Sequence, residues 1–380
     1  SRMVYKSEFP PVPISNESLH AKLLNAIWSH GNLHPTNHAL VAADDSSKYV
    51  TFHELHRQAH SVRAFLLERG FHQGEVASLV LSNCIEWAVF ALGTMAAGGC
   101  VSGASALFTD YELERQFVDS RSTFVFTDEK HLKKYQNSIK NCPTLKTIIC
   151  VRHSSSDTPL NAGVFEWHEV VSRKPDYGVT NLDLESIVAL PYSSGTTGLP
   201  KGVMLTHRGV GTTIEIFVEY DIVTLYFVAS PLYWFIFQES FVLNLPFYHG
   251  FGFGMLCANL LAGAKTVVIG KFEPQLFLAA IQQHRPRILT TVPPILLFLA
   301  KHPMVKQFDC SSLEIVLVGA APTGKDLAME FLAQHKNVKY LCQAYGMTET
   351  TIASHLPVLS VKDPHLGAGK PMSNFEQKVQ

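Results

Sequence analysis

Residues 190–209 read LPYSSGTTGLPKGVMLTHRG, a loop dense in Ser, Thr and Gly that is closed by Pro200 and Lys201. The apolar run SIVAL precedes it, and GVMLTH after it is typical of a strand, so we expect the loop to join two strands. Its Gly residues let backbone N–H groups converge on an anion, while the hydroxyls and the Lys add donors and positive charge. The stretch therefore predicts a phosphate-binding loop.

This loop does not fit the commonest phosphate-loop pattern, G-x-x-x-x-G-K-[ST]. Counted from Gly195, Pro200 takes the second Gly position, and Gly202 stands where the Mg²⁺-binding Ser or Thr would be. Pro200 also opposes the helix that begins there in that motif. The alternative is a flexible Ser- and Gly-rich surface loop, but the density of donors closed by Pro-Lys-Gly favours phosphate.

Apolar runs alternate with amphipathic helical stretches along the chain. Thr51 and Glu54 have the spacing of a helix N-cap and its capping-box partner, and we expect that helix to stop at Gly70. Strands separated by helices predict parallel sheets covered on both faces, and more than one doubly wound α/β unit. The strands expected are EVASLVLSN, STFVFTD, TIICV, SIVALPYSS, AKTVVIG, PRILTTVP and LEIVLVGAA.

The composition is that of a globular protein with a sizeable core, because 47% of the 380 residues are hydrophobic and 17% are charged. The net charge of −1 gives no reason to expect nucleic acid or an anionic membrane as a partner. Seven scattered Cys without a C-x-x-C spacing indicate neither a disulfide framework nor a zinc ribbon, and favour a reducing, cytoplasmic setting.

The stretch YSSGTTGLPKGVMLTH closely resembles the AMP-binding signature of the adenylate-forming superfamily, which includes acyl-CoA synthetases, 4-coumarate–CoA ligases and beetle luciferases. Three further stretches resemble motifs of that family in the same order, LPFYHGFGFG (245–254), LVGAAPTGKDL (317–327) and QAYGMTETT (343–351). The signature is long and specific. The resemblance covers about residues 20–380, apart from one segment.

The resemblance implies a reaction in two steps. A carboxylate attacks the α-phosphate of ATP to give acyl-AMP and pyrophosphate, and the thiol of coenzyme A then displaces AMP to give a thioester. The first two substrates are both anions, so positive charge and Mg²⁺ must offset their repulsion. ATP, Mg²⁺ and coenzyme A are therefore the expected cofactors. The coumarate-like GAAPTGK and the luciferase-like YHGFG favour an aromatic or fatty acid.

By the same resemblance, Lys201, Thr348 and His249 are the expected catalytic residues, and Glu349 is the expected ligand of Mg²⁺. Tyr345 would stack on adenine, Thr348 would bind the α-phosphate, and His249 would line the acyl pocket. The nucleotide-binding residues would be Ser193, Ser194, Gly195, Thr196, Thr197, Gly198, Lys201, Gly319, Ala320, Ala321, Pro322, Gln343, Tyr345, Gly346 and Thr348.

Each of these residues also has a purely structural interpretation. Lys201 would be a solvated surface Lys, and residues 319–322 an ordinary turn from strand to helix. Thr348 would cap a helix whose first turn holds Glu349. A His among aromatic residues, such as His249, is more often packed in a core than functional. The presence of all four motifs favours the functional interpretation.

The family pattern predicts two doubly wound α/β subdomains packed together, plus the start of a truncated β-barrel. The first would combine residues 20–75 with 246–355, the second would be 76–217 with the phosphate loop, and the barrel would start at 356–380. Residues 218–245 do not fit this pattern, and their apolar run is too short for a spanning helix and is interrupted by Pro231. An odd splice product or mistranslated segment is favoured over a buried hairpin or a membrane contact.

The sequence ends at GAGKPMSNFEQKVQ, whereas family members continue through the barrel to a mobile C-terminal domain that carries a catalytic Lys. Because such charge-assisted contacts are worth about 1.5–3 kcal/mol each, we expect this chain as given to have little or no activity. The alternatives are an inactive nucleotide- or acyl-adenylate-binding module or a non-functional fragment, and more weakly a luciferase-like oxidation. We expect a cytoplasmic protein, with a peroxisomal address as the alternative for a full-length form.

Overall fold

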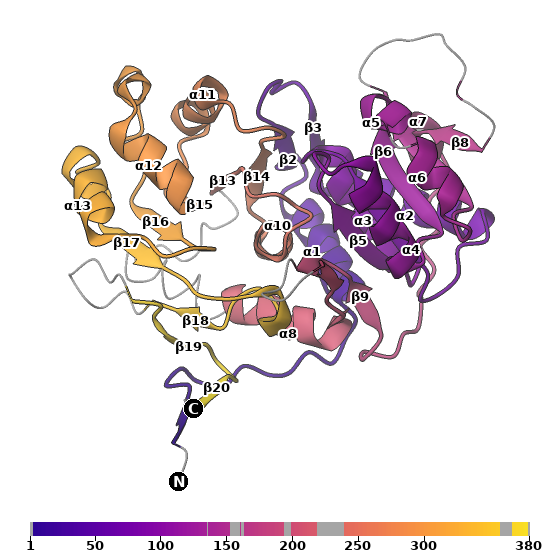
Figure 1. Cartoon of the computed structure of the whole chain (residues 1–380), viewed down its shortest axis with the longest axis horizontal. Coiled ribbons are helices and arrows are strands. Elements are labelled where there is room, and N and C mark those ends of the chain that lie inside the picture. Colours follow the sequence, from indigo (N-terminus) through magenta and orange to yellow (C-terminus); the bar gives the residue numbers. More distant parts are fainter. Residues whose placement is uncertain are drawn as a thin grey trace.

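Mixed α/β layers with parallel sheets make up the protein, as the sequence predicts (Figure 1). The computed structural model describes residues 3–134, 136–152, 160, 163–193, 199–218, 239–357 and 367–378. Most of the apolar segment 218–245 therefore lies outside the described residues, as does part of 356–380.

The largest sheet has seven strands in the order β12-β9-β5-β4-β6-β7-β8. β12 is antiparallel to β9, and all other neighbours are parallel. The order β5-β4-β6-β7-β8 is doubly wound, because the chain moves from β4 to β5 on one side and then crosses to β6 on the other. The strands are β4 (Val76–Val80), β5 (Cys100–Ala104), β6 (Phe124–Asp128), β7 (Thr147–Val151), β8 (Val164–Glu166), β9 (Ile187–Ala189) and β12 (Leu205–Thr206).

Helices connect these strands and pack against them, on the right in Figure 1. Sequence signals set their ends: Thr109 and Glu112 form a reciprocal capping box at the start of one helix, and Arg121 ends it in the left-handed conformation. The helices are α3 (Ile85–Ala96), α4 (Asp110–Ser120), α5 (Glu129–Lys134), α6 (Gln136–Asn141) and α7 (Trp167–Val171).

A second group of strands forms a four-stranded sheet of order β13-β14-β2-β3 and a three-stranded sheet of order β15-β16-β17. Only β3 is antiparallel to its neighbour, and β13 contacts β15 where the two sheets meet. The strands are β2 (His38–Ala42), β3 (Tyr49–Thr51), β13 (Ser240–Leu243), β14 (Lys265–Val268), β15 (Ile288–Thr291), β16 (Ile315–Val318) and β17 (Tyr340–Gln343).

β13 lies in the segment 218–245 that does not fit the family pattern. Its residues 240–243 are all buried and pair with β14 in register. The apolar character of this part of the segment is therefore that of a buried parallel strand, which lies at the end of the four-stranded sheet and contacts β15.

The remaining helices surround the second group of strands and separate it from the seven-stranded sheet. α2 makes the most extensive helix contact, with α3, and so joins the two groups. The helices are α1 (Leu19–Leu33), α2 (Phe52–Glu68), α8 (His207–Ile216), α10 (Gly250–Ala262), α11 (Pro274–His284), α12 (Pro293–Lys301) and α13 (Lys325–Gln334), with 3₁₀ turns η3 (Pro303–Gln307) and η4 (Thr348–Thr350).

The start of α2 confirms the predicted N-cap but not its reciprocal bond. The Thr51 hydroxyl accepts a hydrogen bond from the Glu54 N–H at 3.2 Å. The Glu54 carboxylate instead accepts from Arg57 and Gln58, so its charge stabilises the helix through side chains one turn further on.

The two ends of the described chain lie together at the bottom of Figure 1. β1 (Val4–Lys6) pairs antiparallel with β20 (Glu376–Lys378), and β18 (His355–Leu356) pairs with β19 (Lys370–Pro371). Within the described part of 356–380, these short pairings do not form a closed barrel. None of the helices described by the structure is both long and apolar enough to cross a membrane.

Candidate functional site

Loops at the ends of β10 (Tyr192–Ser193), β16 and β17 meet the start of α10 around an open cleft, which we call the main cleft. Its volume is about 230 Å³, below the roughly 300–1,000 Å³ of pockets that enclose a whole drug-sized ligand, so it suits a ligand that extends beyond it. It is lined by Ser193, His249, Gly250, Phe251, Gly319, Ala320, Ala344, Tyr345, Gly346, Met347, Thr348, Glu349, Ile352 and Ala353.

The predicted phosphate loop lies in an antiparallel hairpin, which confirms that it joins two strands. Ser193 of β10 pairs with Lys201 of β11 (Lys201–Gly202), so the backbone of Lys201 lies beside a cleft residue. The Tyr192 hydroxyl donates to Asp119 of α4 at 2.6 Å, and burial raises the pKa of Tyr192, so the phenol stays protonated and anchors the hairpin. Five of the predicted nucleotide-binding residues lie outside the described residues: Ser194, Gly195, Thr196, Thr197 and Gly198.

His249 is the N-cap of α10, and its role at the cleft depends on this position. Its Nδ1 accepts a hydrogen bond from the Phe251 N–H at 3.2 Å, which requires the neutral tautomer with the proton on Nε2. Desolvation lowers the pKa of the His249 imidazole, which favours the same neutral form. The ring is thus fixed at a helix N-terminus and lines the cleft rather than a closed core.

The loop after β16 reaches the cleft through its first two residues only. Ala320 has a φ of 72°, in the left-handed region, and a Cβ on Gly319 would lie 3.0 Å from the Phe251 ring. A larger residue at position 319 would therefore push Phe251 away from the cleft wall. Ala321 and Pro322 are exposed and do not line the cleft.

Gln343, a predicted nucleotide ligand, has a different place in the structure. It is buried at the end of β17, and its Oε1 accepts a hydrogen bond from the Thr323 N–H at 2.7 Å. This bond ties the end of β17 to the loop after β16. Gln343 therefore holds the loop that carries the cleft residues and does not itself line the cleft.

The segment after β17 supplies the longest continuous part of the cleft wall. Tyr345 is 50% exposed, and its ring meets His355 edge-on with the centroids 5.7 Å apart, so one face remains available for stacking. A Cβ on Gly346 would lie 2.2 Å from the Ile352 carbonyl oxygen, so only Gly fits there. Thr348 and Glu349 lie in η4, a single 3₁₀ turn, which excludes the alternative that Thr348 caps an α-helix.

Strained backbone is concentrated at this wall. Thr351 and Ile352 have φ values of 58° and 86°, and both are β-branched, which makes the left-handed conformation costly. Strain of this kind persists only where surrounding contacts enforce it, and here Ile352 is buried against α10. The packing of Ile352 against α10 therefore keeps the chain turned around the cleft in spite of this strain.

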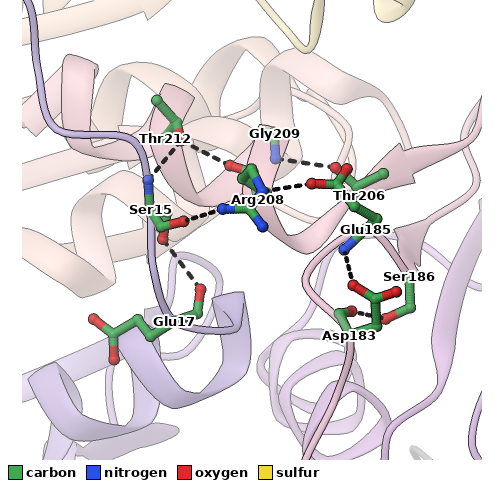
Figure 2. Close-up of polar contacts among 9 residues, drawn as sticks. All are labelled: Ser15, Glu17, Asp183, Glu185, Ser186, Thr206, Arg208, Gly209 and Thr212. Atoms are coloured by element: carbon green, nitrogen blue, oxygen red, sulfur yellow. Dashed lines mark hydrogen bonds and ion pairs between the residues drawn. The ribbon is translucent and has the colours of Figure 1, made fainter.

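Figure 2 shows the hydrogen bonds that join α8, the helix after the hairpin, to the N-terminal segment. The Ser15 N–H donates to the Thr212 hydroxyl at 2.9 Å, and Arg208 donates to the Ser15 carbonyl and pairs with Glu185. At the first residue of α8, directly before Arg208, His207 Nδ1 accepts from the Leu19 N–H at 3.1 Å. The N-terminal segment thus fixes the helix whose start positions the phosphate hairpin.

A small apolar cavity adjoins the main cleft and shares His249 and Gly250 with it. Its volume is about 20 Å³, roughly the space of one water molecule. Trp87, Phe247 and Phe253 are among the aromatic side chains that line it. An apolar group could enter only if these side chains moved.

The structure thus brings Ser193, His249, Gly319, Tyr345 and Glu349 to one cleft from four separate parts of the sequence. It also brings Ala320, Gly346 and Thr348 there, while Lys201 adjoins the cleft through its hairpin partner. Six cleft residues were not predicted from the sequence: Gly250, Phe251, Ala344, Met347, Ile352 and Ala353. The first four lie inside recognised motifs, but nothing in the sequence marks Ile352, whose position depends on the turn at Thr351.

Comparison with known proteins agrees with this arrangement. The family described as "AMP-binding enzyme" matches residues 27–380, so the chain belongs to the adenylate-forming, AMP-binding enzyme family. It is 30% identical to 4-coumarate–CoA ligase 1 of Arabidopsis thaliana over 389 residues, which cover 100% of this chain and 66% of that protein. It is 33% identical to 4-coumarate–CoA ligase 1 of Petroselinum crispum, over 87% of this chain and 58% of the relative.

An animal relative is similar to the same extent. Acyl-CoA synthetase 7 of Caenorhabditis elegans is 30% identical over 96% of this chain and 66% of its own length. The chain therefore spans between 58% and 66% of the length of these three relatives.

Solved structures show the same fold. The anthranilate CoA ligase AuaEII in complex with anthranoyl-AMP superposes with a TM-score of 0.81 at 20% identity, over 95% of this chain and 65% of that one. The luciferase-like enzyme of the nonluminescent Zophobas morio mealworm gives a TM-score of 0.81 at 17% identity, over 97% and 82%. At these identities the likeness concerns the fold alone.

Proposed function

We propose that the protein performs the family reaction, the ATP-dependent activation of an aromatic or fatty carboxylic acid to acyl-AMP, followed by thioester formation with coenzyme A. The observation that carries this proposal is the main cleft, because it gathers residues of all four family motifs. Family membership and the names of the relatives support the reaction class. The proposal that the acid is aromatic or fatty is supported by the apolar cavity beside His249.

Each group at the cleft has a role that its position supports. The exposed face of Tyr345 offers a platform for the adenine ring, and the hydroxyl of Thr348 offers a donor to the α-phosphate. Lys201, beside Ser193, supplies positive charge where pyrophosphate departs. In the first step a carboxylate oxygen forms a bond to the α-phosphorus while the bond to the pyrophosphate oxygen breaks.

Glu349 fits the expected magnesium ion. Mg²⁺ uses one or two carboxylates together with phosphate oxygens and water, so an exposed carboxylate at the cleft beside Thr348 is sufficient. Among the described residues there is no group of three His, Cys, Asp or Glu that could hold a metal without such help. The ion, when bound, would offset the charge on the phosphates.

The neutral His249 is suited to the acyl end of the site. Its Nδ1 is occupied by the Phe251 N–H, so only the Nε2 proton is available to a substrate oxygen. The ring stands between the main cleft and the apolar cavity, both of which it lines. We propose that it positions the carboxylate so that the apolar remainder enters the cavity as Phe247 and Phe253 move aside. The proposed setting is cytoplasmic.

A thermal melt of the purified chain with MgATP and with non-hydrolysable acyl-adenylate analogues tests the proposal. A ligand that binds only the native state stabilises it by RT ln(1 + [L]/Kd), about 2.7 kcal/mol at one hundred times Kd. We expect stabilisation by an analogue with an aromatic or fatty acyl group and not by one with a short polar acyl group. A cooperative melt that no nucleotide or adenylate shifts would contradict the proposal.

A pair of Tyr variants makes this test specific for the cleft. Tyr345→Ala should weaken adenylate binding by about tenfold, because a lost stacking platform costs about 1–3 kcal/mol. Tyr111→Ala removes another exposed Tyr, on α4, and should leave binding unchanged. Equal affinities in the two variants would show that adenine does not stack at Tyr345.

A further inference from the structure

A second, larger cavity lies apart from the main cleft, between the seven-stranded sheet and the four-stranded sheet. Its volume is about 640 Å³, within the range of pockets that enclose a small-molecule ligand. We call it the switch-point pocket. None of its lining residues lines the main cleft, and the family motifs identified in the sequence do not include them.

The position of this pocket follows from the topology of the larger sheet. In the order β5-β4-β6-β7-β8, the connections leave β4 and β6 in opposite directions, so the carboxyl ends of these two strands form a topological switch point. Residues 81–84 after β4 and Asp128 at the end of β6 line the pocket. Open, doubly wound sheets bind their ligands in this crevice.

The other sheet closes the pocket with its own carboxyl ends. β2 and β14 are parallel, and Asp44 after β2 and Lys271 after β14 both line the pocket. Arg152, directly after β7, lines it as well. The pocket therefore lies where five strands of the two sheets end, and the side chains at these ends converge on it from both sheets.

The lining of the pocket carries charged side chains of both signs. Lys48, Arg152 and Lys271 supply positive charge, and Asp44 and Glu86 supply negative charge. A third carboxylate, Asp128, is already bound by the backbone N–H and ring of His131 at 2.8 and 2.7 Å.

Aromatic and helix-terminal groups complete the lining. Trp167 and Tyr49 provide planar walls, and Tyr49 is already stacked on His38 with ring centroids 3.8 Å apart. The N-terminus of the 12-residue α3 also faces the pocket, with the N-cap Cys84 and residues 85–86, and the helix dipole there favours an anion. Burial raises the pKa of the Cys84 thiol, so this Cys stays protonated and the pocket has no thiolate nucleophile.

We propose that the switch-point pocket binds a mononucleotide. Its phosphate lies against Arg152 and Lys271, its ribose hydroxyls donate to Asp44 and Glu86, and its base packs against Trp167. A planar ring, two or more hydroxyl donors and a terminal anion are the features that this lining complements, and they occur together in a nucleotide. This site is independent of the reaction proposed for the main cleft.

Photolabelling with 8-azido-AMP, followed by peptide mapping, locates the ligand directly. We expect labelled peptides that contain residues 81–86, 167 or 268–271, whether or not the main cleft is also labelled. Excess AMP should abolish this labelling, and ribose 5-phosphate or inorganic phosphate should compete at least tenfold less well because they lack the base. Labelling confined to peptides of the main cleft would overturn the proposal.

Matched charge reversals connect the label to the pocket. Lys271→Glu should weaken AMP binding at this site by tenfold or more, whereas Lys336→Glu, a reversal at another exposed Lys, should leave it unchanged. Arg152→Gln is the second variant and should weaken binding in the same way. Unchanged labelling of residues 81–86 and 268–271 in both pocket variants would overturn the assignment. Tyr345→Ala, which removes the half-exposed stacking platform of the main cleft, should leave this labelling intact, so a failure of the proposed reaction is distinguishable from a failure of this site.

Discussion

The main cleft and the switch-point pocket both lie at the ends of strands, but backbone conformation shapes the first and side chains shape the second. The main cleft is shaped by small residues and strained backbone, with Ala320, Thr351 and Ile352 in the left-handed region. The switch-point pocket is shaped by long charged and aromatic side chains on loops that follow regular parallel strands.

This difference explains why only one of the two regions is visible in the sequence. A cleft that depends on backbone conformation needs particular residues at consecutive positions, and these form motifs such as AYGMTE. A pocket lined by side chains from seven separate stretches of the sequence leaves few residues in any one of them, scattered along the chain. Asn83 links the two regions, because it lines the pocket and also bonds the segment that leads to His249.

The largest expected effect tests the claim that backbone shapes the main cleft. Gly346→Ala would place a Cβ 2.2 Å from the Ile352 carbonyl oxygen and 2.4 Å from the Ala353 Cα, and backbone atoms cannot move aside cheaply. We expect a loss of about 3 kcal/mol in the free energy of unfolding, measured by urea denaturation. Gly250→Ala, in the same cleft, meets its nearest atom at 3.9 Å and should be neutral. Equal stabilities of the two variants would contradict the steric argument.

Replacing Asn83 tests whether the two regions are connected. Its side chain donates to the Leu245 carbonyl and accepts from the Phe247 N–H, both at 2.8 Å, and Asn83→Ala leaves both groups unpaired. We expect a loss of about 2–3 kcal/mol and faster hydrogen exchange at the Phe247 amide. Ser82→Ala, at the exposed neighbouring residue, is the control. Unchanged exchange at Phe247 would mean that the two regions are independent.

A fall in pH should weaken the contact between α1 and α8 beside the phosphate hairpin. Burial lowers the pKa of His20 to about 3 and that of His207 to about 4, and both side chains are at most 5% exposed. Below pH 6.5 the two imidazoles are protonated in the unfolded chain but stay neutral in the folded chain. The free energy of unfolding therefore has its full value above pH 6.5 and decreases as the pH falls toward 4.

At pH 5 we expect each imidazole to lower the free energy of unfolding by about 2 kcal/mol, because each pH unit below 6.5 contributes about 1.4 kcal/mol. Urea denaturation between pH 7 and pH 5 measures it. The variant His207→Gln removes one of the two groups and should make the pH dependence shallower. A dependence as steep as that of the wild type would show that His207 does not carry it.

The smallest effect is expected at the exposed end of the same region, drawn in Figure 2. Arg208 pairs with Glu185, and the two side chains are 40% and 60% exposed, so solvent screens most of their attraction. Arg208→Ala should therefore cost less than about 1 kcal/mol, and Arg208→Lys less still. A loss above 2 kcal/mol in urea denaturation would show that the hydrogen bond from Arg208 to the Ser15 carbonyl matters more than the ion pair.

The sequence predicts the α/β class, several central strands and the hairpin position of the phosphate loop, because these depend on local patterns, but it does not predict β5 or β17. Apolar runs in the sequence indicate which segments are buried. Thr51 caps α2, as its spacing from Glu54 predicts. The nucleotide contact of Gln343 stays a prediction, and the structure shows its side chain buried and bonded to the neighbouring loop. Its motif placed it near the cleft, but the direction of its side chain depends on a partner 20 residues away at Thr323.

The sequence by itself determined the family, the α/β class and the motifs whose residues line the main cleft, because steric limits on Gly and on helix caps act between near neighbours. Only the tertiary structure decided that residues 240–243 form a buried strand, that Ile352 lines the cleft, and that Asp44, Arg152 and Lys271 face one pocket. These relations depend on strand order. Strand order is set by burial summed over the whole chain, which no local stretch of sequence contains.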